Sequence, residues 1–101
     1  MILTTEHIKQ VIAGFFGKKP VKKVWLFGSY ARGDADENSD VDVLVDIDHS
    51  TPVGWDYYSW RDELAEKLEK RVDIVSAGWE SKYVKPFMDK DKFIIYERNN
   101  T

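Results

Sequence analysis

Apolar and acidic residues alternate between Asp40 and Asp48, and this alternation limits the folds open to the chain more than any other feature. Side chains of a β-strand point alternately to its two faces. One face of this strand would be wholly apolar, with Val41, Val43, Val45 and Ile47. The other would carry Asp40, Asp42, Leu44, Asp46 and Asp48. Because carboxylates are costly to bury without a neutralising charge, we predict one face in a core and an opposite face that needs a cation.

Helical and extended patterns alternate along the rest of the chain. Apolar residues at helical spacing from Ile8 to Phe16 predict an N-terminal helix, and a second such stripe joins Tyr57 to Leu68. The other expected elements are strands at 21–27, 72–75 and 93–96, a short helix after Gly28 and another around 84–88. The order α-β-α(short)-β-α-β-α-β predicts the α/β (α+β) class, with helices packed on a small sheet.

Length and composition narrow the class of protein further. The 101 residues suit a single domain over 1–101, and 43 % of them are hydrophobic, enough for one core. The absence of cysteine excludes disulfides, thiol chemistry and zinc sites with cysteine ligands. No apolar run approaches the roughly 20 residues of a membrane span, and the N-terminus has no signal-peptide pattern. We therefore expect a cytoplasmic protein without membrane contact.

The acidic residues are concentrated in one segment. Between Gly33 and Trp60 the chain has eight acids and no lysine or arginine, within a net charge of −3. A nucleic-acid-binding domain normally presents a basic surface, so direct nucleic-acid binding is not expected. Part of the segment imitates an EF-hand calcium loop. The imitation fails at Ser39 and Val45, which occupy the positions that need glycine and glutamate.

Three features of the sequence combine into a candidate catalytic site. Gly28-Ser29 ends a buried strand and starts a helical turn, where backbone N–H groups and a hydroxyl favour phosphate. Asp40 and Asp42 share a strand face, and a divalent cation would relieve their repulsion. Oxygen ligands without cysteine or a neighbouring histidine favour Mg²⁺ or Mn²⁺. A site with two ions needs a further carboxylate, and Asp73, flanked by apolar residues in the next expected strand, is the candidate.

The combined pattern resembles the signature of the DNA polymerase beta-like nucleotidyltransferase superfamily. Gly28-Ser29, ten further residues and Asp40-Val41-Asp42 match its Gly-Ser and Asp-x-Asp elements without a gap. As a combination the pattern is far more specific than any of its pieces.

The surroundings of the signature look like the minimal nucleotidyltransferase (MNT) domains. The similar segments are 27–33, 39–45 and 72–75, and the least characteristic segment runs from 48 to 58. MNT domains are stand-alone domains of about this length, often paired with a HEPN-family protein. The resemblance implies one nucleotidyltransferase domain over 1–101, with that family's fold on a small mixed β-sheet.

The resemblance also implies catalytic roles. Asp40, Asp42 and Asp73 would hold two Mg²⁺ (or Mn²⁺) ions and act as the catalytic acids, with Asp73 orienting or deprotonating an acceptor hydroxyl. An in-line attack on the α-phosphorus of a nucleoside triphosphate would transfer a nucleotidyl group and release pyrophosphate.

Nucleotide and partner follow from the same resemblance. Gly28 and Ser29 would bind the β- and γ-phosphates, and Arg32 would add positive charge there. In the paired systems the nucleotide is ATP and the acceptor is a tyrosine of the HEPN ribonuclease, so the chain would act as an antitoxin.

Simpler interpretations stay open for each piece. Gly28-Ser29 alone suits a tight turn, Asp73 alone a strand-edge or capping acid, and the acidic segment alone a solvated loop. A different function is also open: an inactive relative that neutralises or scaffolds a partner by binding alone. Nothing visible is missing from the motif, so catalysis is the favoured interpretation.

A dense aromatic set lies near the expected rim of the site. Tyr57 and Trp60 belong to the core stripe of their helix. Trp55 or Tyr58 would be able to stack on a nucleobase or dock a partner, but core packing is the favoured interpretation. Aromatic residues left exposed in so small a domain would indicate assembly into an oligomer.

Overall fold

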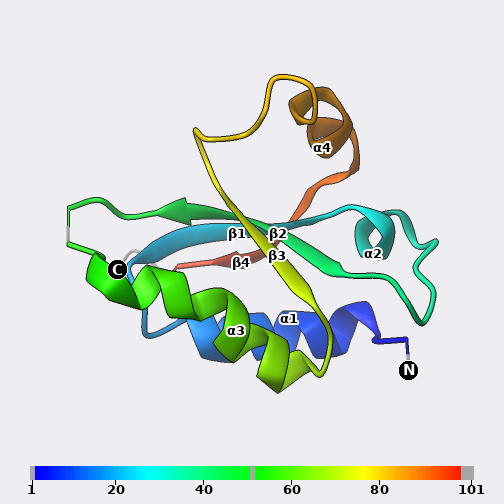
Figure 1. The fold of residues 1–101 in the computed structure, drawn as a ribbon, viewed down its shortest axis with the longest axis horizontal. Coiled ribbons are helices and arrows are strands. Elements are labelled where there is room, and N and C mark those ends of the chain that lie inside the picture. Colours follow the sequence, from blue (N-terminus) through cyan, green and yellow to red (C-terminus); the bar gives the residue numbers. More distant parts are fainter. Residues whose placement is uncertain (1, 51, 99–101) are drawn as a thin grey trace.

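Four strands form a mixed sheet: β1 (Val21–Phe27), β2 (Val41–Ile47), β3 (Val72–Ser76) and β4 (Phe93–Glu97). The computed structural model describes residues 2–50 and 52–98. The strand order is β3-β2-β1-β4, so β3 and β4 are the edges. β1 runs antiparallel to both β2 and β4, whereas β2 and β3 are parallel. The expected mixed sheet is therefore confirmed (Figure 1).

The helices divide between the two faces of this sheet. They are α1 (Thr5–Phe16), the short α2 (Ser29–Arg32), α3 (Tyr57–Leu68) with the 3-10 turn η1 (Gly54–Asp56) before it, and α4 (Lys85–Asp91). α1 and α3 lie side by side under one face, whereas α4 stands on the opposite side (Figure 1). We name these the helix-covered face and the open face.

The main core lies between the sheet and the pair α1 and α3. The apolar face of β2 provides Val41, Val43 and Val45, all fully buried. The α1 stripe predicted from the sequence is buried against them, and Phe16 meets Trp60 of α3 edge to face, with ring centroids 5.8 Å apart. The periodicities of three elements therefore converge on one apolar layer.

A smaller core lies on the open face. Phe27, Leu44 and Met88 form it, and Met88 is the buried residue of α4. The sequence predicted a helix here from Val84, Phe87 and Met88, and the helix is confirmed, but Val84 and Phe87 are exposed. α4 thus buries Met88 against the sheet and leaves much of its surface to solvent.

The predicted boundaries agree closely with the structure. β1 and β2 match the expected ranges, and β3 and β4 each extend one residue further. α1 begins as its capping pattern indicates, because the Thr4 hydroxyl accepts a hydrogen bond from the His7 N–H at 3.1 Å. None of the helices in residues 2–50 and 52–98 has the length and apolarity that a membrane crossing requires.

Candidate functional site

The Gly28 corner stands against the Asp42 carboxylate. β1 and β2 pair so that Phe27 lies opposite Asp42, and the chain then turns at Gly28 with φ 77° and ψ −156°. A Cβ atom on residue 28 would overlap an Asp42 carboxylate oxygen. Glycine is therefore required at this position for two reasons: its backbone conformation disfavours any other residue, and only a bare backbone leaves room for the carboxylate.

The short helix α2 is held in place by a buried tyrosine. Tyr30 packs in the main core, and its hydroxyl accepts a hydrogen bond from the Leu3 N–H at 3.3 Å. The N–H groups of Ala31 and Arg32 both donate to the Gly28 carbonyl at 3.0 Å. Ser29 therefore occupies the first turn of an anchored helix, directly after the glycine that lies against Asp42. That Gly28 and Ser29 bind phosphate stays a prediction.

Two of the predicted acids lie side by side on the open face. Asp42 of β2 and Asp73 of β3 are direct neighbours in the parallel register. Asp42 is half-buried, and its pKa is raised from 3.8 to about 6, first by burial and then by the charges of Asp73 and Asp40. The negative charge of Asp42 is therefore not fully offset by positive charges at this point of the sheet.

The third acid is turned toward an arginine. Asp40 accepts a hydrogen bond from Arg71 Nε at 3.1 Å, on an exposed part of the surface. Consistent with this, no group of three acidic or histidine side chains within residues 2–50 and 52–98 is arranged to hold a metal ion. Asp40 still contributes to the raised pKa of Asp42. It would have to exchange Arg71 for a cation in order to join Asp42 and Asp73.

The donor set fits a hard divalent cation. Asp42 and Asp73 offer carboxylate oxygens. Burial first, and then the charges of Asp73 and Asp40, raise the pKa of Asp42, and a bound cation would offset both effects. Substrate phosphates commonly complete the coordination of Mg²⁺, so a pair of carboxylates is a sufficient protein contribution.

Arg32 connects α2 to α4. Its guanidinium donates to Asp91 at 2.9 Å and to Asp34 at 3.2 Å. These two hydrogen bonds raise the pKa of Arg32, and its charge in turn works against the raised pKa of Asp42. Arg32 is thus near enough to act on Asp42 but is engaged by two other carboxylates. Its contact with phosphate remains a prediction.

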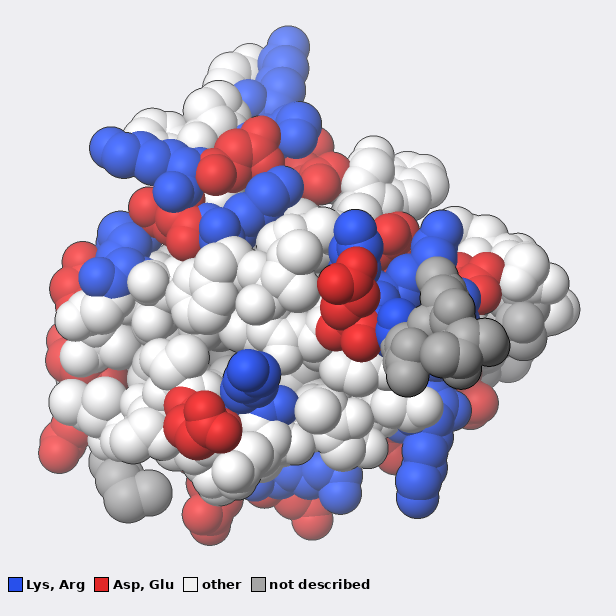
Figure 2. Space-filling model, turned by 180° about the vertical axis from the view of Figure 1, so that it is seen from behind, with Lys and Arg blue, Asp and Glu red and all other residues white. Residues whose placement is uncertain are grey.

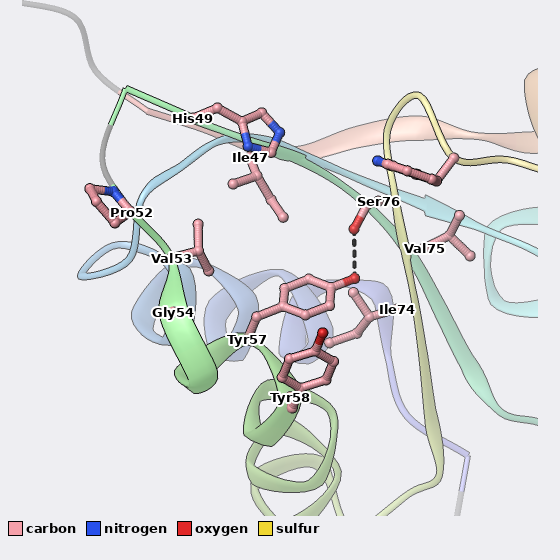
Figure 3. A pocket seen from close by; sticks show the side chains of 11 residues that line it. Ile47, His49, Pro52, Val53, Gly54, Tyr57, Tyr58, Ile74, Val75 and Ser76 are labelled. Atoms are coloured by element: carbon pink, nitrogen blue, oxygen red, sulfur yellow. Dashed lines mark hydrogen bonds between the residues drawn. The ribbon is translucent and has the colours of Figure 1, made fainter.

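A cavity of about 620 Å³ lies at the far end of β2 and β3, and the sequence did not predict it. Tyr57 and Tyr58 at the start of α3 form one wall, and Ile74, Val75 and Ser76 of β3 form another (Figure 3). The Tyr57 hydroxyl and the Ser76 hydroxyl share a hydrogen bond of 2.6 Å. We call this cavity the aromatic pocket; its remaining lining residues are Ile47, His49, Pro52, Val53, Gly54 and Trp79.

The favoured interpretation of Trp55 and Tyr58 as core residues is wrong. Trp55 is 86 % exposed and Tyr58 is 72 % exposed. Trp55 falls in the 3-10 turn ahead of α3, and Tyr58 lies one residue off the stripe that buries Trp60, so neither side chain reaches the core. Tyr57 and Trp60 do pack against the core as predicted. Trp79, which the sequence analysis did not single out, stands alone after a glycine turn and is also exposed.

Charge on the surface is mixed. Seen from behind, acidic and basic side chains surround a broad uncharged area (Figure 2). Several large apolar side chains are exposed, among them Trp55, Trp79 and Phe87. Exposed aromatic residues of this size are typical of surfaces that bind a partner.

Comparison with known proteins gives one family. The model of the nucleotidyltransferase domain family matches residues 8–99. The chain is also 36 % identical over 81 residues to protein adenylyltransferase MntA of Thermococcus cleftensis. The matched region covers 73 % of this chain and 78 % of the relative.

Solved structures agree in fold. One protein solved as a provisionally assigned minimal nucleotidyltransferase superposes with a TM-score of 0.71 at 26 % identity, covering 90 % of this chain and 95 % of its own. A chain from the complex of a tri-AMPylated Shewanella oneidensis HEPN toxin with its MNT antitoxin has a TM-score of 0.69 at 18 % identity, covering 93 % and 73 % respectively. At that identity the second likeness is one of fold alone.

Proposed function

Since this chain belongs to the nucleotidyltransferase domain family and is a nucleotidyltransferase, we propose that it transfers AMP from ATP to a tyrosine hydroxyl of a HEPN-family toxin and thereby acts as an antitoxin. The name of the Thermococcus relative supports AMP as the group transferred and a protein as the acceptor. The Shewanella complex supports a HEPN protein as that acceptor. We further propose that the reaction depends on Mg²⁺.

One observation carries the proposal: the bare backbone of Gly28 lies against Asp42, which is itself in register with Asp73. This arrangement sets an exposed-backbone turn of the kind that favours phosphate beside two carboxylates on the open face. Asp42 and Asp73, with Asp40 once it leaves Arg71, would hold Mg²⁺, which when bound neutralises charge on the triphosphate. Gly28 and Ser29 would position the β- and γ-phosphates, while Asp73, at the edge strand, is open to an incoming acceptor.

The proposed transfer is a single displacement. The acceptor oxygen forms a bond to the α-phosphorus of ATP as the bond from that phosphorus to the bridging oxygen of the β-phosphate breaks. Pyrophosphate leaves with the electron pair, and the acceptor proton passes to the Asp73 carboxylate. Positioning and charge neutralisation provide most of the rate enhancement in such reactions.

The test is label transfer from α-labelled ATP with Mg²⁺ to the co-expressed HEPN-type protein. The wild type should label the partner, and Asp42→Asn should reduce the rate by about a thousandfold, because it removes a charge that acts on the reacting phosphate. Asp46→Asn is the matched control: Asp46 lies on the same face of the same strand and is also partly buried. It should retain the wild-type rate. Equal rates in Asp42→Asn and the wild type would refute the catalytic role of this carboxylate.

A second candidate function is neutralisation of a partner by binding alone. The ion pair between Asp40 and Arg71 favours it, because one acid of the motif is already neutralised within the chain. The two candidates separate in the same assay. A binding-only protein leaves the partner unlabelled in both wild type and Asp42→Asn, while both still retain the partner on a column.

A further inference from the structure

A groove follows the outer edge of β3 from the acids to the aromatic pocket. Three cavities make it up, of about 400, 200 and 620 Å³. The first and second share Arg61 and Asp73, and the second and third share Tyr57, Tyr58 and Ile74. We call the whole the edge groove. Because neighbouring cavities share lining residues, they adjoin one another along the edge of β3 from Asp73 to the aromatic pocket.

Within the described residues, some backbone groups along this groove have no hydrogen-bond partner. The Arg71 carbonyl accepts from Val41 N–H at 2.9 Å, and Ala77 N–H donates to the Val45 carbonyl at 2.8 Å. Alternate residues of a strand bond to the same neighbour, so 71, 73, 75 and 77 face β2 and Ile74 and Ser76 face outward. The Ser76 carbonyl is taken by Trp79 N–H at 3.0 Å. The Ile74 N–H and C=O and the Ser76 N–H remain directed at the free edge, where an added strand would bind.

Exposed aromatic side chains flank the pocket end of the edge groove. Trp79 is 83 % exposed and Tyr58 is 72 % exposed, although both line the pocket. Tryptophan and tyrosine at the mouth of a pocket are the residue types that provide most of the binding energy in protein interfaces. The opposite edge strand, β4, is not part of these cavities and lies away from the acids.

We propose that the edge groove binds an extended segment of the acceptor protein as a strand added to β3, with an apolar side chain of that segment in the aromatic pocket and the acceptor hydroxyl at Asp73. This proposal rests on the proposed function, which requires a protein acceptor. Two observations favour a polypeptide over a small molecule: the outward-facing backbone groups, and the adjoining cavities from Asp73 to the pocket.

The geometry also sets the spacing within the acceptor. Asp73 points to the open face with Asp42, whereas Ser76 points toward Tyr57 of α3, so the two side chains lie on opposite faces of β3. They are three residues apart, about 10 Å along a strand. The pocket-binding side chain of the acceptor is therefore expected three residues from the modified one, and not two or four.

The experiment measures steady-state constants with the acceptor protein that the wild-type enzyme labels from α-labelled ATP. Trp79→Ala should raise the KM for the acceptor about tenfold while leaving the KM for ATP within about twofold. Phe87→Ala is the matched control, since Phe87 is likewise a largely exposed aromatic residue (72 %, against 83 % for Trp79) but lies on α4, outside the edge groove. It should change neither constant.

A second pair of variants tests the strand addition itself. Ser76→Ala removes only the hydroxyl that bonds Tyr57, whereas Ser76→Pro also removes the outward N–H and leaves the bonds to β2 in place. Ser76→Pro should raise the acceptor KM well above that of Ser76→Ala. If Ser76→Pro fails to fold, as circular dichroism would show, Trp79→Ala alone decides the question.

The outcomes separate this inference from the proposed function. If the wild type labels no protein, the proposed function fails and the inference falls with it. If the wild type labels its acceptor but Trp79→Ala keeps the wild-type acceptor KM, only the edge-groove inference is overturned. A rise in the KM for ATP alone would make the pocket a nucleotide site, and an equal effect of Phe87→Ala would place the acceptor elsewhere; either result overturns the inference.

Discussion

The helix-covered face and the open face of the sheet are built from the same strands but differ in burial and in charge. β2 provides both: its valines are fully buried under α1 and α3, while Asp42 and Asp46 on the other side are only half-buried. The helix-covered face holds a continuous apolar layer with paired aromatic rings. The open face has a three-residue core and a set of repelling carboxylates.

This difference shows how so small a domain can hold repelling charges. One fully packed face provides most of the stability, so the other face is free to keep carboxylates that the fold itself does not need. Removing a core side chain on the helix-covered face should therefore lower the free energy of unfolding, whereas removing a repelling charge on the open face should raise it. The following predictions test that difference.

The largest effect is expected in the main core. Trp60→Ala should lower the free energy of unfolding by about 3–5 kcal/mol, because it removes a fully enclosed aromatic side chain between α1 and the sheet. Trp55→Ala, in the same region but exposed, should change it by less than about 0.5 kcal/mol. Urea denaturation measures both. Similar losses in the two variants would contradict the assignment of the core.

An intermediate effect is expected at the corner that joins the faces. Gly28→Ala should cost about 2–4 kcal/mol, since it adds backbone strain and forces a methyl group into the Asp42 carboxylate. Gly33→Ala has a similar positive φ but open space around its Cβ position, so it should cost only about 1 kcal/mol. Thermal denaturation of the two variants isolates the contact with Asp42, and equal losses would show that no such contact exists.

The smallest effect concerns the charge of Asp42. Burial is the main cause that raises the pKa of Asp42 from 3.8 to about 6 in the folded protein. Between these two pH values the folded state holds a proton that the unfolded state has released. In chelator, stability should therefore fall as pH rises from about 4 to 6, by about 1–2 kcal/mol after allowance for solvent screening.

Asp42→Asn removes this pH dependence. The variant should be more stable than the wild type at pH 7 in chelator and equal to it near pH 4. Asp40→Asn should bring no comparable gain, because Asp40 is paired with Arg71. Denaturation curves at several pH values test this, and a loss of stability in Asp42→Asn at pH 7 would mean that the carboxylate supports the fold.

Local patterns were enough to predict the elements and the acidic strand face. The alternation in β2 depends on residues two apart, and the stripe in α1 on residues three and four apart, so both could be recognised in the sequence. The motif singled out Asp42, and the apolar residues around Asp73 singled out that acid; the parallel register of β2 and β3 brings the two together.

Such local patterns could not predict contacts between residues that are far apart in the sequence. Asp40 meets Arg71 across 31 residues, and Arg32 meets Asp91 across 59. Neither pair follows from a local period, and both change how the site residues are engaged. The edge groove depends on β3 being an edge strand, and strand order is likewise a property of the whole chain.

The most direct test of the account is the thermal stability gained from Mg²⁺ with a non-hydrolysable ATP analogue. At a ligand concentration about a hundred times Kd, the wild type should gain about 2.7 kcal/mol, and Asp46→Asn should gain as much. Asp42→Asn should gain almost nothing, as should the wild type when chelator replaces Mg²⁺. An equal gain in Asp42→Asn and the wild type would contradict the claim that the acids of the open face hold the metal and its nucleotide.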